Sequence, residues 1–206
     1  MHTTPRDHSG RPTGGVVTTD HPSAAPDRTA HAMTADHAEA WLAREADLLR
    51  TLSLGDDTWV HQNPADLVLT HGVFWTPSPW PQAQHPKRLG ECFAAAHEWA
   101  DREGWTYVEG LVLLPEVPPG MPHVFDHAWC LTADGTIADP AVPDGWAGRY
   151  LGVPYTHAFR NAMPERAGTA LITAGPFSRL PYTGHNTEIL RHGLPPGALH
   201  TTTEEI

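Results

Sequence analysis

The stretch HAWCLTADGTIADP, residues 127–140, decides the fold. Its two halves are rich in strand-forming residues and flank Asp134-Gly135, a strong turn signal, so the stretch predicts a β-hairpin. With a two-residue loop at Asp134-Gly135, Asp139 would face Cys130 and lie on the opposite face of the hairpin from His127.

A three-residue loop, 133–135, gives a different register. With Gly135 left-handed in a bulge, Thr132 pairs with Thr136 and Asp139 stands opposite Trp129. His127 and Asp139 are then diagonal neighbours on one face, within reach of a hydrogen bond. The sequence permits both registers, and we predict the second.

One cysteine lies upstream of this hairpin, in GECFAAA at 90–96. The alanines and the following Gly104 predict a helix from near Gly90 to Gly104, which places Cys92 in the first turn. Unpaired backbone N–H groups and the helix dipole stabilise a thiolate at such a position, as in many nucleophilic cysteines. A buried packing role is the alternative for Cys92, and it is our assignment for Cys130 in mid-strand.

The rest of the chain suggests an α+β fold. Residues 1–32 lack an apolar period and are expected to form a disordered tail. A helix is predicted from an N-cap at Asp36 to Leu52, followed by an irregular, proline-rich region from Thr58 to Arg88 in which VLTHGVFW could form a short strand. The apolar face expected for this helix consists of Ala38, Trp41, Leu42, Leu48, Leu49 and Leu52.

Strands are predicted after the cysteine helix, and the helices are expected to pack on a mainly antiparallel sheet. The predicted strands are WTYVEGLVLL, 123–132, 136–140, YLGVPYTHAF and TALITAGPF. We expect one domain at 33–184 and a C-terminal tail at 185–206 that could contain a short helix.

Composition restricts the function. The 206 residues carry a net charge of −11, so the surface repels phosphate backbones and anionic membranes. No apolar run approaches a membrane span, and the N-terminus lacks the apolar core of a secretory signal. We therefore expect a cytoplasmic protein with free thiols and with neither nucleic acid nor membrane as partner.

The order GECF, HAW and ADP, at 90–93, 127–129 and 138–140, resembles the transglutaminase-like branch of the papain-like cysteine enzymes. The resemblance covers Gly90 to Pro140, with Phe93 and Ala141 departing from the residues usual in that family. It implies a papain/transglutaminase-like fold, whose nucleophile helix packs on the sheet, and a Cys92-His127-Asp139 triad. The activity implied is thiol-dependent acyl transfer or amide hydrolysis through a Cys92 thioester, without metal or cofactor.

The same resemblance implies an oxyanion hole and a peptide or small-molecule acyl substrate. The backbone N–H of Cys92 is one candidate donor, and Gln82 and Gln84 in the preceding loop are others. Trp129 is expected to pack beside the site, and Glu109 could reach it if its strand neighbours the histidine strand.

Two other interpretations remain open. A metal site could use His123, Asp126 and His127, but on a strand the two histidines lie about 13 Å apart, too far to share an ion. A non-catalytic binding module could use the loop Pro77–Pro86 with Trp75 and Trp80 as an interaction face.

Overall fold

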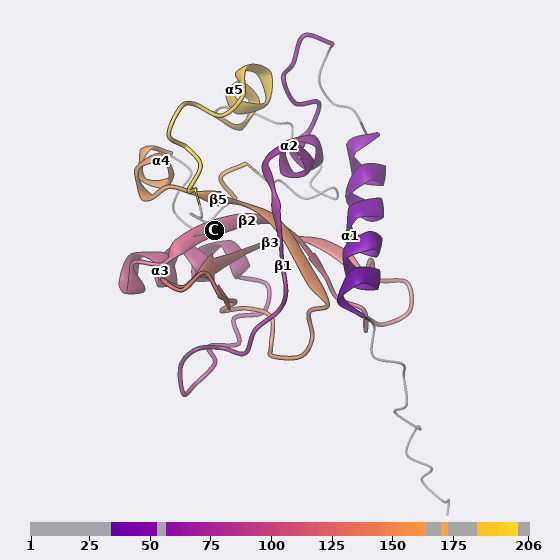
Figure 1. The fold of residues 1–206 in the computed structure, drawn as a ribbon, viewed down its shortest axis with the longest axis vertical. Coiled ribbons are helices and arrows are strands. Elements are labelled where there is room, and N and C mark those ends of the chain that lie inside the picture. The colour runs from indigo at the N-terminus through magenta and orange to yellow at the C-terminus, as the bar shows by residue number, and fades with distance from the viewer. Residues whose placement is uncertain (1–33, 53–56, 164–169, 173–184, 202–206) are drawn as a thin grey trace, which may run out of the picture. The chain divides into compact units, whose positions relative to one another are not determined.

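The computed structural model describes residues 34–52, 57–163, 170–172 and 185–201, all within one compact unit, Met33–Ile206. The chain is α+β, with helices around one five-stranded antiparallel sheet (Figure 1). The helices are α1 (Ala35–Arg50), α2 (Pro64–His71), α3 (Cys92–Glu103), α4 (His157–Ala162) and α5 (His185–His192). The strands are β1 (Val73–Trp75), β2 (Thr106–Leu113), β3 (Val124–Leu131), β4 (Ile137–Ala138) and β5 (Arg149–Tyr155).

The strand order is β1-β5-β2-β3-β4, so β2 lies at the centre and β4 at an edge. One sheet face and all five helices share the main core, and the other face carries a smaller cluster around Trp129 and Tyr150. Side chains that face the helices include Tyr107, Ala128 and Cys130. The predicted arrangement of helices on an antiparallel sheet is confirmed at this level.

Two glycines, Gly110 and Gly152, face each other across β2 and β5. A Cβ on Gly110 would lie 2.1 Å from the carbonyl oxygen of Leu151, and a Cβ on Gly152 would lie 2.4 Å from the indole ring of Trp129. Neither distance is compatible with a side chain. The two strands therefore approach more closely than any other residue type would allow, and Trp129 fills the space above Gly152.

The hairpin has the register that we predicted. Leu131 pairs with Ile137, the N–H of Thr132 donates to the carbonyl of Thr136, and Gly135 is left-handed with φ 78°. The loop is therefore 133–135, and Asp139 follows on the same face as Trp129.

Other predicted elements are confirmed near their expected bounds. The cysteine helix ends at Gly104, which is left-handed with φ 70°, and Trp105 leads directly into β2. WTYVEGLVLL forms β2, and the stretch 123–132 forms β3.

The first helix differs from the prediction in its cap and in its buried face. Thr34, not Asp36, is the N-cap, and its hydroxyl accepts from the N–H of His37. Ala38, Leu42 and Ala46 form the buried face, whereas Leu48 and Leu52 are exposed. Trp41 and Leu49 of the expected face are partly buried against the main core, so the predicted face is wrong only at Leu48 and Leu52.

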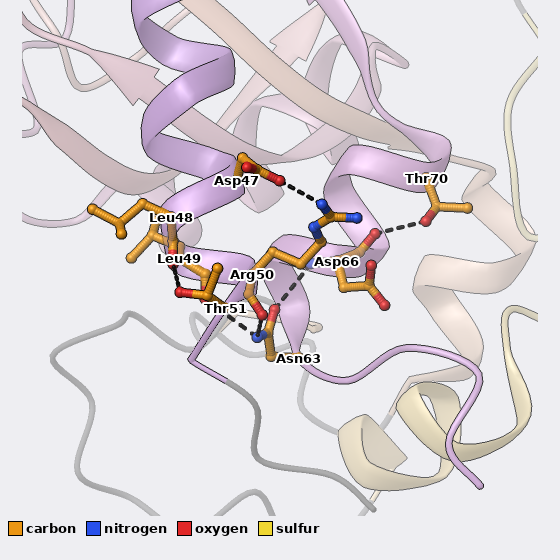
Figure 2. A network of polar contacts seen from close by, with 8 residues as sticks. All are labelled: Asp47, Leu48, Leu49, Arg50, Thr51, Asn63, Asp66 and Thr70. Atoms are coloured by element: carbon orange, nitrogen blue, oxygen red, sulfur yellow. Dashed lines mark hydrogen bonds and ion pairs between the residues drawn. The ribbon is translucent and has the colours of Figure 1, made fainter. Parts of the chain in front are cut away.

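The region 58–88 contains a helix that the sequence analysis missed. Asn63 caps α2 by accepting from the N–H of Asp66, and Pro64 occupies the first turn, where a missing N–H costs nothing. The same Asn63 side chain donates to the carbonyls of Leu49 and Arg50 at the end of α1 (Figure 2). It also donates to the carbonyl of Leu52, just beyond the helix. Asn63 thus joins α1 to α2. The short strand β1 follows α2.

Three predictions about the C-terminal half need correction. The run YLGVPYTHAF is only partly a strand, because Thr156 caps α4 by accepting from the N–H of Phe159. In TALITAGPF, residues 170–172 form no strand, and the remainder lies mostly outside the described residues. The predicted tail at 185–206 begins with α5, whose Leu190 is fully buried in the main core.

The described part of that segment is therefore part of the domain. The N–H of His61 donates to the carbonyl of Leu190, and the N–H of His200 donates to the carbonyl of Pro154. The predicted N-terminal tail, 1–32, lies outside the described residues.

Candidate active site

The hairpin brings His127 and Asp139 into direct contact. Nε2 of the buried imidazole lies 2.7 Å from Oδ2 of the buried carboxylate. The contact follows from the register, because Asp139 stands opposite Trp129 and diagonally from His127. These two predicted site residues are thus brought together by the hairpin loop at 133–135.

Asp139 is held in its ionised form by four hydrogen bonds. Oδ1 accepts from the N–H groups of Ala141 and Val142 at 2.8 and 3.0 Å. Oδ2 accepts from the Tyr150 hydroxyl at 2.8 Å as well as from His127. Burial alone would raise the pKa of Asp139, but the charge of His127 and these donors lower it below its ordinary value.

The imidazole of His127 carries a strongly shifted pKa. Burial alone would lower the pKa, but the charge and hydrogen bond of Asp139 and the contact with Cys92 raise it to about 10. The raised pKa favours the protonated imidazole at neutral pH. Because Nε2 is hydrogen-bonded to the Asp139 carboxylate, Nδ1 is the ring nitrogen left to contact the Cys92 thiol.

Cys92 is the first residue of α3 and is half-buried. Its thiol reaches the His127 imidazole, and its hydrogen bond and charge are among the causes of the raised histidine pKa. No side chain caps the helix at Glu91, so the first-turn N–H groups stay available to a negative charge. Gly90, with φ 80°, turns the chain sharply into this helix end.

Three side chains from separate elements therefore meet in the order sulfur, imidazole, carboxylate. The loop before α3 lies along the strand end that carries the carboxylate, because the N–H of Arg88 donates to the carbonyl of Pro140 at 3.0 Å. The His85 imidazole also contacts the carbonyl of Val142 at 3.0 Å. These contacts fix the start of the cysteine helix to the end of the hairpin.

Trp129 lies beside the site, as expected. It is fully buried, and its ring stacks at 6.1 Å and 19° to the His127 imidazole. Tyr150, which the sequence analysis did not identify, packs at 5.0 Å from Trp129 and donates to Asp139. Its only sequence signal is its place in the predicted strand YLGVPY.

Glu109 does not lie with His127. It pairs with Ala128 in the register of β2 and β3, whereas His127 pairs with Gly110, so the two side chains point to opposite faces. The buried carboxylate instead accepts from the Tyr107 hydroxyl at 2.7 Å and from the N–H groups of Leu171 and Ile172. Glu109 thus holds the segment 170–172 against the sheet.

Gln82 and Gln84 are exposed, and within the described ranges neither makes a hydrogen bond to Cys92, His127 or Asp139. The structure therefore gives no support to either glutamine as an oxyanion donor. The backbone N–H of Cys92, at the first residue of α3, stays a candidate donor.

The residues of the metal interpretation do not converge. The ring of His123 lies 4.8 Å from the ring of Trp41, and its Nδ1 contacts the carbonyl of Leu114 at 3.1 Å. Within the described segments of the chain, no group of three His, Cys, Asp or Glu side chains could hold a metal ion.

The tryptophans of the binding-module interpretation are not exposed together. Trp80 is buried and packs edge-on against Trp99 and Trp105 at 4.7 and 5.8 Å. Trp75 packs edge-on against Trp129 at 5.9 Å. Both aromatic side chains support the core, so they do not form the face that this interpretation requires.

Comparison of the chain with protein-family models, curated proteins and solved structures found no match. Of the helices that the structure describes, none is long and apolar enough to span a membrane.

Proposed function

We propose that the protein is a cysteine-dependent acyltransferase or amidohydrolase of transglutaminase-like fold. The observation that carries the proposal is the simultaneous contact of the His127 imidazole with the Cys92 thiol and the Asp139 carboxylate. A histidine so placed can pass a proton between a sulfur nucleophile and a leaving group, with the carboxylate fixing the ring.

In the first step, the sulfur of Cys92, whose proton is carried on Nδ1 of His127, attacks an acyl carbon of an amide or thioester. The oxyanion that forms is stabilised by the first-turn N–H of Cys92 and the positive end of α3. The proton on Nδ1 of His127 then passes to the leaving amine or thiol as its bond to carbon breaks. The product is an acyl thioester on Cys92 and a neutral imidazole.

In the second step, water or an amine attacks the thioester. His127 takes the proton of this acceptor while Asp139 stabilises the imidazolium that forms again. The carbon–sulfur bond breaks, and the acid or the new amide leaves. A peptide or small acyl donor is the proposed substrate.

The test is a search for the thioester on the full chain, with p-nitrophenyl acetate as acyl donor. Peptide mass spectrometry should find the acetyl group on Cys92 in the wild type and lose it in C92S. H127A should slow acetylation by about a hundredfold or more, as expected for a general acid–base group. The matched control is C130S, because the buried Cys130 thiol donates to the carbonyl of Ala96 at 3.2 Å and has a raised pKa.

Acetylation of Cys92 that is equally fast in H127A would contradict the proposal. So would acetylation that is shared equally between Cys92 and Cys130, because that would indicate ordinary thiol chemistry.

A further inference from the structure

The Tyr150 hydroxyl is a buried group to which the proposed mechanism gives no task. Its ring belongs to the smaller cluster, on the sheet face that also carries Trp129 and His127. The hydroxyl donates to Oδ2 of Asp139 at 2.8 Å. The same oxygen contacts Nε2 of His127 at 2.7 Å. Two donors from separate strands therefore meet on one carboxylate oxygen.

The strand register lets Tyr150 reach this oxygen from beyond the central strand. β5 and β3 are separated by β2, where Tyr150 pairs with Val112 and His127 pairs with Gly110. Gly110 has no side chain that could separate the rings of Tyr150 and His127, whose centroids lie 6.2 Å apart. The ring of Trp129 packs at 5.0 Å from Tyr150 and at 6.1 Å from His127. Ring packing thus fixes the position of the Tyr150 hydroxyl.

The two oxygens of Asp139 are held in different ways. Oδ1 accepts from the N–H groups of Ala141 and Val142, which lie two and three residues further along the same segment and so move with Asp139. Oδ2 is the oxygen that faces His127, and the Tyr150 hydroxyl ties it to β5, inside the sheet. Asp139 itself follows β4, a two-residue strand at the edge. Tyr150 therefore anchors the carboxylate independently of the histidine.

We propose that Tyr150 is a positioning residue, whose hydroxyl holds Oδ2 of Asp139 where it orients the His127 ring toward the Cys92 sulfur. The inference rests on the proposed function and deepens it by adding a residue that acts through Asp139. The hydroxyl is a neutral donor, so it fixes the carboxylate without removing the charge that stabilises the imidazolium. A support that is itself locked by packing is what a precisely oriented catalytic group requires.

The experiment measures the rate of Cys92 acetylation by p-nitrophenyl acetate on the full chain. Y150F removes the hydroxyl and keeps the ring, and the rate should fall about tenfold, as expected for a hydrogen bond to a charged group. The matched control is Y155F, the same substitution in the same strand. Tyr155 lies on the opposite face of the sheet, and its hydroxyl has no hydrogen-bond partner in the described parts of the chain. Y155F should therefore react within about twofold of the wild-type rate.

Two further measurements separate positioning from general support of the fold. If Tyr150 acts through the carboxylate, D139A and D139A/Y150F should react equally slowly. The His127 C–H resonance should still titrate above neutral pH in Y150F, because Asp139 keeps its charge. A loosened core would instead admit water and bring the pKa of His127 toward its ordinary 6.5. The other titratable groups that act on this set, all retained in Y150F, are Cys92, Asp126, Cys130 and Asp144.

The outcomes separate this inference from the proposed function. A wild-type chain that is not acetylated on Cys92 overturns the proposed function and, with it, the inference. A Y150F rate equal to the wild-type rate, with H127A still slow, overturns the role of Tyr150 alone. An equal loss of rate in Y155F, or a D139A/Y150F rate well below that of D139A, also overturns it, because either would indicate general destabilisation. Circular dichroism checks folding, and a Y150F chain that does not fold overturns the inference, since the hydroxyl would then support the fold.

Discussion

Asp139 sets the protonation state of its partner histidine. Burial and the carboxylate charge act on the pKa of His127 in opposite directions, and the carboxylate prevails. D139N removes the charge and leaves the burial, so the pKa of His127 should fall from about 10 to below its ordinary 6.5. The histidine C–H resonance, assigned with H127Q, should therefore titrate below neutral pH in D139N.

Y150F is the matched control for that titration. It removes the other side-chain hydrogen bond to Oδ2 of Asp139 but keeps the negative charge. His127 should stay protonated at neutral pH in Y150F. A D139N protein whose His127 remains protonated at about pH 8 would show that the carboxylate does not control the ring.

The site residues differed in how far the sequence could identify them. His127 and Asp139 could be placed together because a hairpin register is a local property, whereas the expectation that Cys92 joins them came from the family resemblance. The strand of Glu109 does neighbour the histidine strand, as the expectation required, but Glu109 pairs with Ala128 and not with His127. That register depends on pairing between strands that are distant in the sequence. Tyr150 was missed for the same reason, since β5 returns to pair with β2.

The junction of α1 and α2 depends on one amide. Asn63 donates to carbonyls at the end of α1 and accepts from the first turn of α2. N63A should lower the free energy of unfolding by about 2–3 kcal/mol, because it removes a cap and leaves carbonyls unpaired. Urea denaturation measures this loss.

T34A is the control for that prediction. Thr34 caps only the exposed start of α1, so T34A should lower the free energy of unfolding by about 1 kcal/mol or less. Equal losses in T34A and N63A would mean that Asn63 acts as a simple cap and not as a bridge between the helices.

The close approach of β2 and β5 gives a second prediction for the elements. G152A should cost about 2–3 kcal/mol and change the near-UV signal of tryptophan, since its Cβ would meet the Trp129 ring at 2.4 Å and the Glu109 carbonyl at 2.8 Å. The control is G120A, where a Cβ meets nothing within 4 Å and only the left-handed backbone is strained. An unchanged tryptophan signal in G152A would contradict the packing of Trp129 described above.

Among the elements, those with strong local signals were predicted well. Gly135 and Gly104 fixed the hairpin loop and the end of the cysteine helix, because each position needs a left-handed backbone. Helix α2 was missed because prolines nearby suggested an irregular region, although Asn63-Pro64 is a regular helix start. The position of β5 between β1 and β2 could not be predicted, because it depends on packing between remote segments.

At the scale of the whole molecule, Asp126 should make stability depend on pH. Its folded pKa is raised from 3.8 to about 7, so its contribution to stability is complete below about 3.8 and is lost as the pH rises through 7. D126N should match the wild type in unfolding free energy near pH 4 and exceed it near pH 8. The difference should approach the order of 4 kcal/mol, as a shift of about three units implies.

Urea denaturation of both proteins across this range measures the difference. E116Q, which removes an exposed carboxylate, should follow the wild-type curve. A D126N curve parallel to that of the wild type would mean that the Asp126 carboxyl is not shielded as the structure indicates.

The central claim is that Cys92, His127 and Asp139 act as one unit. A double-mutant cycle on the rate of Cys92 acetylation by p-nitrophenyl acetate tests it most directly. If the carboxylate acts only through the ring, H127A and H127A/D139A should be equally slow, about a hundredfold or more below the wild type. The claim would be contradicted if the fold-reductions in rate caused by H127A and by D139A multiply in the double mutant. It would also be contradicted if H127A reacts at nearly the wild-type rate.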